Sequence, residues 1–344
     1  MAIMMTSEAK VLITGAAGMV GSHLIDFLRI QEPTWDLHLL LRWQESLDNL
    51  EHILADVENP SVGLTIHYGD LRDLISLEHI CETISFDYVF HLAAQSFPKT
   101  SFSNPIETYD CNIQGTENLL YAIHKHSPSA KVHVCSSSEV YGQVSKEEFP
   151  ISESCRFHPA SPYAISKVGT DLIGQHYAQA YDLETRVTRM FTHTGPRRGD
   201  VFAESTFAKQ IAMIEAGVKA PIVKVGNLDS LRTWADVRDA VRAYHLLLTH
   251  DGIMRGDVFN IGGATVKTIG EMLEHLLSLS KVSGIRVEQD ETRLRPIDAD
   301  LQVPDTSKFS RISGWEPEIP FEKTMEDLLD YWRERVRNRQ FLSR

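Results

Sequence analysis

The sequence feature that most limits the fold is a regular alternation, over the first half of the chain, of short apolar runs and longer amphipathic segments. The runs that we expect to form strands are residues 10–14 (KVLIT), 36–41 (DLHLLL), 64–68 (LTIHY), 88–94 (YVFHLAA) and 131–136 (KVHVCS). Short apolar strands separated by helix-length segments are typical of a parallel sheet with helices on both faces. The pattern therefore predicts an α/β protein with a doubly wound parallel sheet.

The regularity ends after residues 184–191 (ETRVTRMF). The expected elements of the second half are a helix at 202–217, short strands at 221–225 and 257–261, and helices around 233–249, 268–279 and 321–336. We predict that residues 1–190 form mainly the sheet domain. Residues 191–344 would then form mainly a smaller, irregular α/β part, with some chain crossing back to the sheet. The cleft between the two parts is the default ligand site.

Composition excludes several classes of protein. The 344 residues carry a formal net charge of -13, which argues against a general nucleic-acid binder. No apolar run approaches the roughly 18 residues that span a bilayer, and the first residues do not resemble a secretory signal, so we expect a cytoplasmic protein without a membrane partner. The four cysteines form no CxxC pair and the histidines form no HExxH motif. We therefore expect no metal site.

A glycine-rich turn directly follows the first expected strand. Gly15, Gly18 and Gly21 form a GxxGxxG pattern that opens an amphipathic helix. Glycines at such positions let the backbone turn tightly and approach a pyrophosphate at the helix N-terminus. The alternative is a turn that binds nothing. The position of the loop directly after the first strand favours a dinucleotide site and a sheet of the Rossmann type.

The ends of the next strands extend this expected site. Arg42 follows the second strand, where NAD-binding proteins usually carry an acidic residue, so it favours the 2′-phosphate of NADP, with NAD as the alternative. Arg42 as a solvated surface residue is the other interpretation. Asp70, just past the third strand, can accept a hydrogen bond from an adenine amine. The small residues Ala93 and Ala94 of HLAAQS leave room for a cofactor.

The stretch SPYAISK places Tyr163 and Lys167 four residues apart, on one face of a helix that Pro162 helps to start. A neighbouring ammonium stabilises a phenolate, which makes the phenol a usable acid or base. The stretch YAIHK repeats this spacing with Tyr121 and Lys125. We interpret this second pair as structural, because no hydroxyl-rich loop precedes it.

Such a loop does precede the first pair. The fifth expected strand ends in CSSSEVYG, with three serines at 136–138 followed by Glu139. The carboxyl ends of parallel strands share one edge of a sheet, where open α/β sheets bind their ligands. We therefore expect these side chains to converge with Tyr163. The alternative for Glu139 is a solvated carboxylate.

The glycine loop, HLAAQS, SSSEVYG and SPYAISK, in this order, resemble the extended short-chain dehydrogenase/reductase family, whose members act on nucleotide-activated sugars. The likeness runs from Lys10 to Trp332. Stretches such as GPRRG and RLRPIDADLQVPDTSK are most similar to the GDP-mannose 4,6-dehydratases of that family, with the GDP-4-keto-6-deoxymannose reductases second. The resemblance implies an NADP-binding domain over residues 1–190 and a nucleotide-sugar-binding part over 191–344. It also implies a homodimer or homotetramer.

The resemblance further implies catalytic roles. Tyr163 would take the proton of the sugar C4 hydroxyl, while Lys167 holds the ribose and lowers the pKa of the tyrosine. Glu139 would remove the C5 hydrogen so that the C6 hydroxyl can leave. Ser137 would hydrogen-bond the C4 oxygen, at a position where the dehydratases usually have threonine, and Ser138 would contact the substrate.

Other positions carry over from the family as contacts to cofactor and nucleotide. The expected cofactor contacts are Gly15, Gly18, Met19, Val20, Gly21, Arg42, Asp70, Leu71, Leu92, Ala93, Ala94, Ser96, Tyr163, Lys167, His193 and Arg198. The expected substrate contacts, besides Ser138, are Lys209, Asn227, Arg232 and Arg295. Arginines suit a diphosphate because a guanidinium pairs bidentately with phosphate oxygens. Thr192, Thr194, Met19 and Val20 depart from the dehydratase pattern.

These observations leave four functions open. The first is a redox-neutral dehydratase that retains its NADP. The second is a reductase that consumes NADPH, in which Glu139 would be a bystander. The long segment 42–63 favours the first, because the corresponding dehydratase loop takes part in cofactor binding and subunit contact. An epimerase on another nucleotide sugar and a cofactor-binding regulator without turnover are the others.

Overall fold

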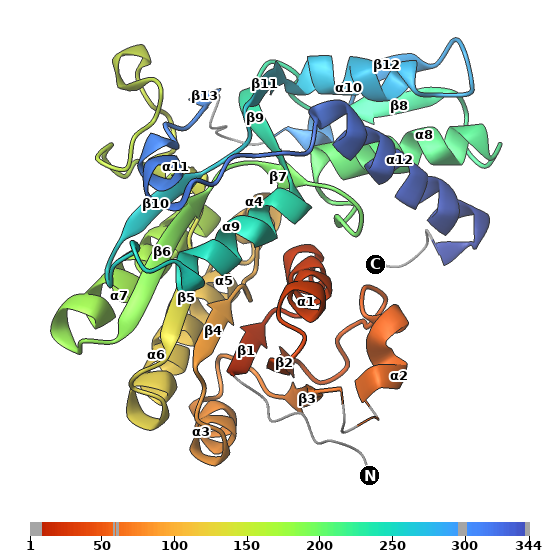
Figure 1. The fold of residues 1–344 in the computed structure, drawn as a ribbon. Helices are drawn as coiled ribbons and strands as arrows, with labels where there is room; N and C mark the ends of the chain where they lie inside the picture. The colour runs from red at the N-terminus through yellow and green to blue at the C-terminus, as the bar shows by residue number, and fades with distance from the viewer. Residues whose placement is uncertain (1–8, 58, 60–61, 295–300, 341–344) are drawn as a thin grey trace.

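A seven-stranded sheet forms the centre of the larger part of the molecule, in a computed structural model that describes residues 9–57, 59, 62–294 and 301–340 (Figure 1). The strands are β1 (Lys10–Thr14), β2 (Asp36–Leu41), β3 (Leu64–Tyr68), β4 (Tyr88–His91), β5 (Lys131–Cys135), β6 (Glu184–Met190) and β10 (Val258–Ile261). All neighbours are parallel, in the order β10-β6-β5-β4-β1-β2-β3. The first six strands have the order of a Rossmann fold, so the predicted sheet is confirmed.

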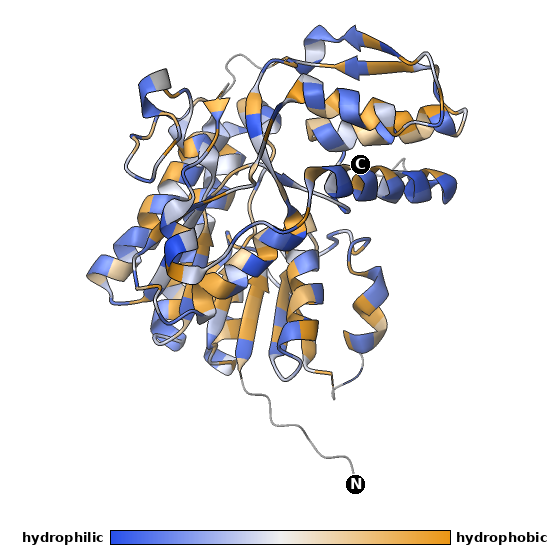
Figure 2. Cartoon of the chain, turned by 45° about the horizontal axis from the view of Figure 1, so that its top comes forward, coloured by the Kyte–Doolittle hydropathy of each residue, from blue (hydrophilic) through white to orange (hydrophobic). Residues whose placement is uncertain are grey.

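Helices cover both faces of this sheet, which explains why its strands are apolar along most of their length (Figure 2). On one face, α1 (Met19–Gln31) and α9 (Val237–Thr249) pack on β1, β2 and β6 in one hydrophobic cluster. On the other face lie α3 (Leu74–Thr83), α6 (Gly115–His126) and α7 (Pro162–Ala180). Shorter helices complete this half: α2 (Leu54–Val57), α4 (Pro98–Ser103) and α5 (Pro105–Tyr109).

The second half builds a smaller part beyond the carboxyl edge of the sheet, at the top of Figure 1. Its helices are α8 (Ala203–Glu215), α10 (Ile269–Ser278) and α12 (Phe321–Arg337), whereas α11 (Ser307–Ser313) packs against β10 of the main sheet. Its strands are β7 (His193–Thr194), β8 (Ile222–Val225), β9 (Leu231–Asp236), β11 (Thr265–Thr268), β12 (Arg286–Gln289) and β13 (Leu301–Gln302). A separate hydrophobic cluster that includes Trp234, Phe321 and Trp332 holds α8, α10 and α12 together.

Two expectations about this half need correction. The helix expected around 233–249 begins only at Val237, because Asp236 caps it by accepting the Arg238 backbone N–H at 2.8 Å. The residues before it form strand β9. The strand expected at 257–261 is not part of the smaller domain: β10 is the edge strand of the main sheet, so the chain crosses back at this point.

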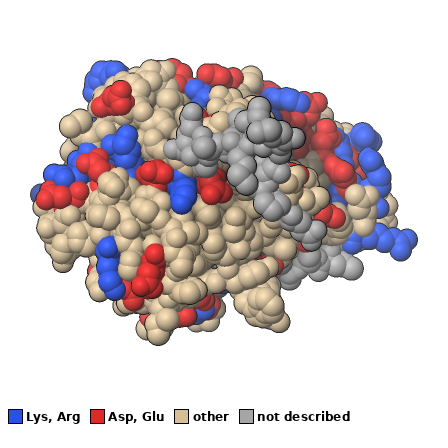
Figure 3. Space-filling view, turned by 60° about the horizontal axis from the view of Figure 1, so that its bottom comes forward, with Lys and Arg blue, Asp and Glu red and all other residues tan. Residues whose placement is uncertain are grey.

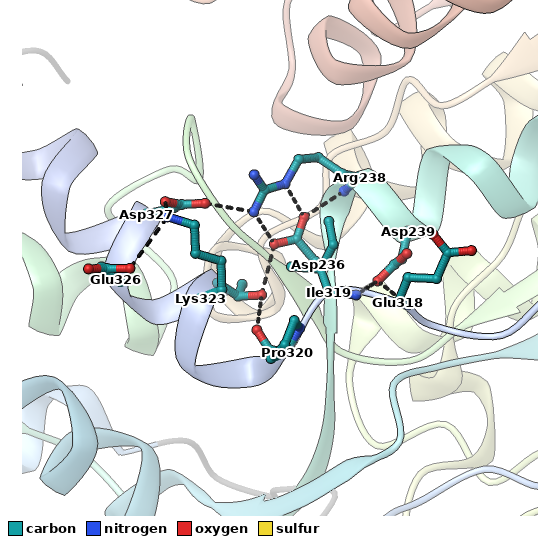
Figure 4. A network of polar contacts seen from close by, with 10 residues as sticks. Asp236, Arg238, Asp239, Glu318, Ile319, Pro320, Lys323, Glu326 and Asp327 are labelled. Atoms are coloured by element: carbon teal, nitrogen blue, oxygen red, sulfur yellow. Dashed lines mark hydrogen bonds and ion pairs between the residues drawn. The ribbon is translucent and has the colours of Figure 1, made fainter.

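Carboxylates at the start of α9 bind side chains and backbone groups of α12 and of the segment before it (Figure 4). Asp236 accepts a hydrogen bond from the Thr324 hydroxyl at 2.8 Å, and Arg238 bridges Asp236 to Asp327 at 2.7 and 2.8 Å. Asp239 accepts the backbone N–H groups of residues 318 and 319. Because Asp236 is buried, these bonds satisfy a charge that would otherwise be costly, and they position β9 relative to the sheet.

Charged side chains of both signs are interspersed on the face shown in Figure 3. Within the part of the chain that the structure describes, no helix is long and apolar enough to cross a membrane. The same residues contain no group of three or more His, Cys, Asp or Glu side chains placed to hold a metal ion.

Candidate functional site

One cleft of about 820 Å³ lies between the carboxyl edge of the main sheet and the smaller part. The predicted residues that line it are Gly15, Gly18, Met19, Val20, Gly21, Arg42, Asp70, Leu71, Leu92, Ala93, Ala94, Ser96, Ser137, Ser138, Glu139, Tyr163, Lys167, His193, Arg198, Asn227 and Arg232. Lys209 is not among the lining residues, but it pairs with Asp200, which does line the cleft. Arg295 lies outside the described residues. Motifs far apart in the sequence therefore meet at one site.

The glycine loop forms one end of the cleft. Gly15 has a φ of +69°, and a Cβ there would come within 2.8 Å of the Ala93 backbone nitrogen. A Cβ on Gly21 would lie 2.3 Å from the Gly15 carbonyl oxygen, so both positions require glycine. Gly18 is the N-cap of the 13-residue helix α1 and makes no side-chain cap hydrogen bond. This uncapped N-terminus suits the pyrophosphate of a dinucleotide.

Two arginines lie near the ends of β2 and β3. Arg42 is exposed, and its guanidinium lies 3.6 Å from the Glu45 carboxylate. Arg72 donates two hydrogen bonds to the Asp70 carboxylate, at 2.6 and 3.0 Å, and this pairing lowers the pKa of Asp70. Both arginines line the cleft, so this end can accept an additional phosphate. The segment between β2 and β3 also reaches the glycine loop, where the Asn49 amide donates to the Ala17 carbonyl at 2.9 Å.

Tyr163 lies in the first turn of α7, deep in the cleft. The Ser161 hydroxyl caps this helix by accepting the Ala164 N–H at 3.0 Å, and Pro162 is the first helical residue, as predicted. The Tyr163 side chain is largely buried. Burial raises the pKa of its phenol, while a hydrogen bond with Ser137 and the positive charge of Arg198 act in the opposite direction. Arg198 is thus a cation that favours the phenolate in this structure.

Lys167 lies one turn farther along α7 and is also buried. Its ammonium donates a hydrogen bond to the Cys135 carbonyl at the end of β5, at 2.7 Å. Burial lowers the pKa of Lys167. The net pKa direction for Tyr163 is upward, which differs from the lowering by Lys167 that the spacing suggested, because the loss of hydration outweighs the nearby charges.

The serine-rich stretch after β5 forms the opposite wall. Ser137 caps a short 3₁₀ helix (Ser138–Tyr141) and accepts the Glu139 backbone N–H at 3.2 Å. This cap turns the Glu139 side chain into the cleft, where its carboxylate lies 3.9 Å from the Arg232 guanidinium of β9. Glu139 is therefore paired within the cleft, and the alternative of a solvated carboxylate does not describe it.

The cations contributed by the smaller part are also held by carboxylates. Arg198 donates to Glu204 at 3.0 Å and stacks over the Phe202 ring at 3.4 Å, while Lys209 pairs with Asp200 at 2.7 Å.

Two uncharged side chains of the smaller part also line the cleft. Burial, together with the charge of Arg198, lowers the pKa of His193 to about 4, so this imidazole is neutral near pH 7. The Asn227 amide donates to the Ser230 hydroxyl at 3.2 Å.

Comparison with known proteins agrees with this geometry. The family model described as GDP-mannose 4,6 dehydratase matches residues 12–328. The chain belongs to this family. GDP-mannose 4,6 dehydratase 1 of Arabidopsis thaliana is 32% identical to it, over 93% of this chain and 88% of the relative. GDP-6-deoxy-D-mannose reductase of Pseudomonas aeruginosa is 30% identical, over 95% of this chain and 98% of the relative.

Solved structures of family relatives have the same fold. The structure of RMD from Pseudomonas aeruginosa complexed with NADPH aligns with a TM-score of 0.80 at 29% identity, over 95% of this chain and all of that one. dTDP-glucose 4,6-dehydratase from Bacillus anthracis, in complex with NAD, aligns with a TM-score of 0.81 at 25% identity, over 96% of this chain and 98% of that one. The predicted resemblance to extended short-chain dehydrogenases is therefore confirmed.

The cleft also contains residues that motif reasoning missed. Among them are Arg72, Phe97, Lys99, Phe202, Trp234 and Arg293. Lys99 donates to the Thr292 carbonyl and so joins the two halves across the cleft. Three of these residues directly follow motifs that the sequence did mark: Arg72 comes two positions after Asp70, and Phe97 and Lys99 follow HLAAQS. The others come from the irregular half: Arg293 begins the RLRPIDADLQVPDTSK stretch, whereas Phe202 and Trp234 lie outside the stretches quoted above.

Proposed function

We propose that this protein is a nucleotide-sugar 4,6-dehydratase that converts GDP-mannose to GDP-4-keto-6-deoxymannose. The observation that carries the proposal is the convergence of Ser137, Glu139, Tyr163 and Lys167 on one cleft that also contains the glycine loop. This set supplies both a proton-transfer phenol and a separate carboxylate base. Dehydration needs both functions, because the C4 hydroxyl and the C5 carbon each lose a proton.

We propose NADP as the cofactor, with NAD as the alternative. When bound, it would supply an acceptor for the hydride of C4 and return that hydride to C6. The uncapped N-terminus of α1 would hold the pyrophosphate, and Arg42 and Arg72 would meet the 2′-phosphate. Arg42→Asp tests this assignment: the ratio of NADP to NAD affinity should fall by about tenfold or more. An unchanged ratio would remove Arg42 from the site.

The side chains of this chain would divide the proton transfers between them. Tyr163 takes the proton of the C4 hydroxyl, and Ser137 hydrogen-bonds both the phenol and the C4 oxygen. Lys167, anchored on the Cys135 carbonyl, holds the cofactor ribose next to Tyr163. The C4 ketone acidifies the C5 hydrogen, which Glu139 removes as a proton. The same carboxyl group then gives this proton to the departing C6 oxygen, so that water leaves and the carboxylate is restored.

The smaller part would bind the nucleotide. Arg232 and Asn227 line the cleft and suit the diphosphate. Lys209 of α8 would approach it from its ion pair with Asp200, a residue of the lining. We therefore propose residues 1–190 as mainly the NADP-binding domain and 191–344 as mainly the GDP-sugar-binding part. We also propose a cytoplasmic homodimer or homotetramer. The names of the relatives support a GDP-linked substrate.

The second candidate is an NADPH-dependent GDP-4-keto-6-deoxymannose reductase. Two observations favour it: Met19 and Val20 replace the polar pair of the dehydratases, and a reductase relative covers 95% of this chain. The deciding experiment incubates purified protein with GDP-mannose, without added cofactor, and follows the nucleotide sugar by mass spectrometry. Loss of one water supports the dehydratase. An unchanged sugar, followed by NADPH consumption with GDP-4-keto-6-deoxymannose, supports the reductase.

A further inference from the structure

Among the described residues of the cleft, Arg232 forms an ion pair with the proposed base. The Arg232 guanidinium lies 3.9 Å from the Glu139 carboxylate, and the two side chains are only 12% and 15% exposed. Arg232 lies within β9, between β11 and β13, so its backbone is fixed by ladders on both sides. Rotation of the Arg232 side chain would change the distance between guanidinium and carboxylate.

The other cations of the smaller part differ from Arg232 in this respect. Arg198 is held by Glu204 and Lys209 by Asp200, two carboxylates to which no proton transfer is assigned. Moving either cation would leave the proposed base unchanged. Moving Arg232 would remove the cation that lies beside the Glu139 carboxylate.

We propose that Arg232 exchanges partners during binding: it pairs with Glu139 in the free protein and turns to the substrate diphosphate when the nucleotide sugar enters. The inference rests on the proposed function, in which Glu139 is the base and Arg232 a diphosphate contact. A diphosphate offers a guanidinium more charge and a bidentate geometry. Glu139 then faces C5 without this counter-ion.

In the part of the chain that the structure describes, few other groups surround the Glu139 carboxylate, so the position of Arg232 matters for its charge. Besides Arg232, the groups that act on this part of the cleft are the Ser137 hydroxyl, the Tyr163 phenol and, near the phenol, Arg198. Arg198 remains on Glu204. The pairing thus keeps the carboxylate compensated until the substrate arrives and makes Arg232 a positioning residue for the base.

Competition between two anions for one cation is measurable as a binding coupling, without turnover. The experiment measures the affinity of GDP for NADPH-loaded protein by calorimetry, in wild type, Glu139→Gln, Arg232→Met and the double variant. Glu139→Gln removes the competing anion, so GDP should bind about five- to tenfold more tightly. In the Arg232→Met background the same change should alter GDP affinity by less than about twofold.

Two further variants separate this exchange from simpler effects. In a Lys209→Met background, Glu139→Gln should still tighten GDP binding, because Arg232 is intact. Arg232→Lys keeps a cation and should retain part of the coupling. Thermal unfolding of each variant checks that the fold is preserved.

The outcomes distinguish the inference from the function on which it rests. Equal tightening by Glu139→Gln with and without Arg232 would mean direct repulsion between Glu139 and the diphosphate, and would overturn the exchange. Weaker GDP binding by Glu139→Gln would overturn it as well. Either result leaves the dehydratase standing on its turnover assay. Failure of the wild-type protein to bind GDP would overturn both.

Discussion

Two helices of this protein carry a tyrosine and a lysine four residues apart, and the two pairs have opposite surroundings. On α6, the Tyr121 side chain is 44% exposed, and Lys125 forms a surface ion pair with Glu78 of α3 at 2.5 Å. On α7, Tyr163 is only 8% exposed, and Lys167 is buried against the end of β5. The same spacing therefore produces two different chemical environments.

The difference shows which part of a motif carries chemistry. A spacing of four residues places two side chains on one face of a helix and does no more. The surroundings of that face determine the chemical environment of the pair. The pair on α7 lies against a strand end with hydroxyls and a carboxylate, whereas the pair on α6 remains at the surface. The predictions below contrast the two pairs.

The strongest test replaces each tyrosine in turn. Tyr163→Phe removes the proposed proton acceptor for the C4 hydroxyl, so the rate of water loss from GDP-mannose should fall by about 10⁴-fold. Tyr121→Phe should stay within about twofold of wild type, because its hydroxyl faces solvent. Initial rates by mass spectrometry, with NADPH binding as the control for folding, measure both. A comparable loss in Tyr121→Phe would show that the comparison is wrong.

The carboxylates near the two pairs provide the second test. Glu139→Gln should lower dehydration by about 10³-fold, because an amide cannot remove the C5 hydrogen. Exchange of that hydrogen with deuterated solvent should be lost at the same time. Glu78→Gln, the matched change at the exposed pair, should leave the rate within about twofold. Full dehydration by Glu139→Gln would leave this carboxylate without its assigned role and favour the reductase.

Replacing the two lysines should also affect turnover differently, but by a smaller factor than replacing the tyrosines. Lys167→Met removes the charge proposed to hold the ribose but leaves the phenol in place, so turnover should fall by about 10²-fold, partly through weaker cofactor binding. Lys125→Met breaks only a surface ion pair and should not change turnover measurably. Rates at saturating NADP separate the two contributions of Lys167. Equal sensitivity of the two lysines would contradict the distinction between the pairs.

Much of the cofactor side of the cleft was predictable from sequence, since it follows from local patterns. Apolar runs marked the strands, and the residues just after each run, such as Asp70 and Glu139, lie at one edge because parallel strands all point there. Glycine positions were readable because the tight turn at Gly15 excludes a Cβ. These signals need only a few neighbouring residues.

The substrate side was less predictable, because its arrangement depends on contacts between distant segments. The helix-like periodicity after 233 concealed strand β9, which exists only because β7, β11 and β13 pair with it. The ion pair between Arg232 and Glu139 joins residues from different halves of the chain. No local pattern encodes such a partner, and the same holds for Lys99 and its contact across the cleft.

The smallest expected effect is on the pH dependence of the unfolding free energy, through a buried histidine near Lys167. His91, at the end of β4, hydrogen-bonds Thr14 at 3.0 Å and Thr116 at 2.9 Å. Burial, with a contribution from the charge of Lys167, lowers the pKa of His91 to about 3. The unfolded chain, with an ordinary histidine pKa near 6.5, binds the proton first as pH falls. Stability from this group is therefore complete above about pH 6.5 and is lost progressively toward pH 3.

The size of this effect follows from proton linkage. Over that window His91 should contribute about 1.4 kcal/mol per pH unit to the slope of the unfolding free energy. His91→Asn should reduce the slope by that amount in urea unfolding at a series of pH values, whatever its effect on absolute stability. His79→Gln, on the exposed face of α3, is the matched control and should leave the slope unchanged. An unaltered slope in His91→Asn would mean that His91 is already protonated in the folded protein, and that the core beneath Lys167 is as accessible to water as the surface around Lys125.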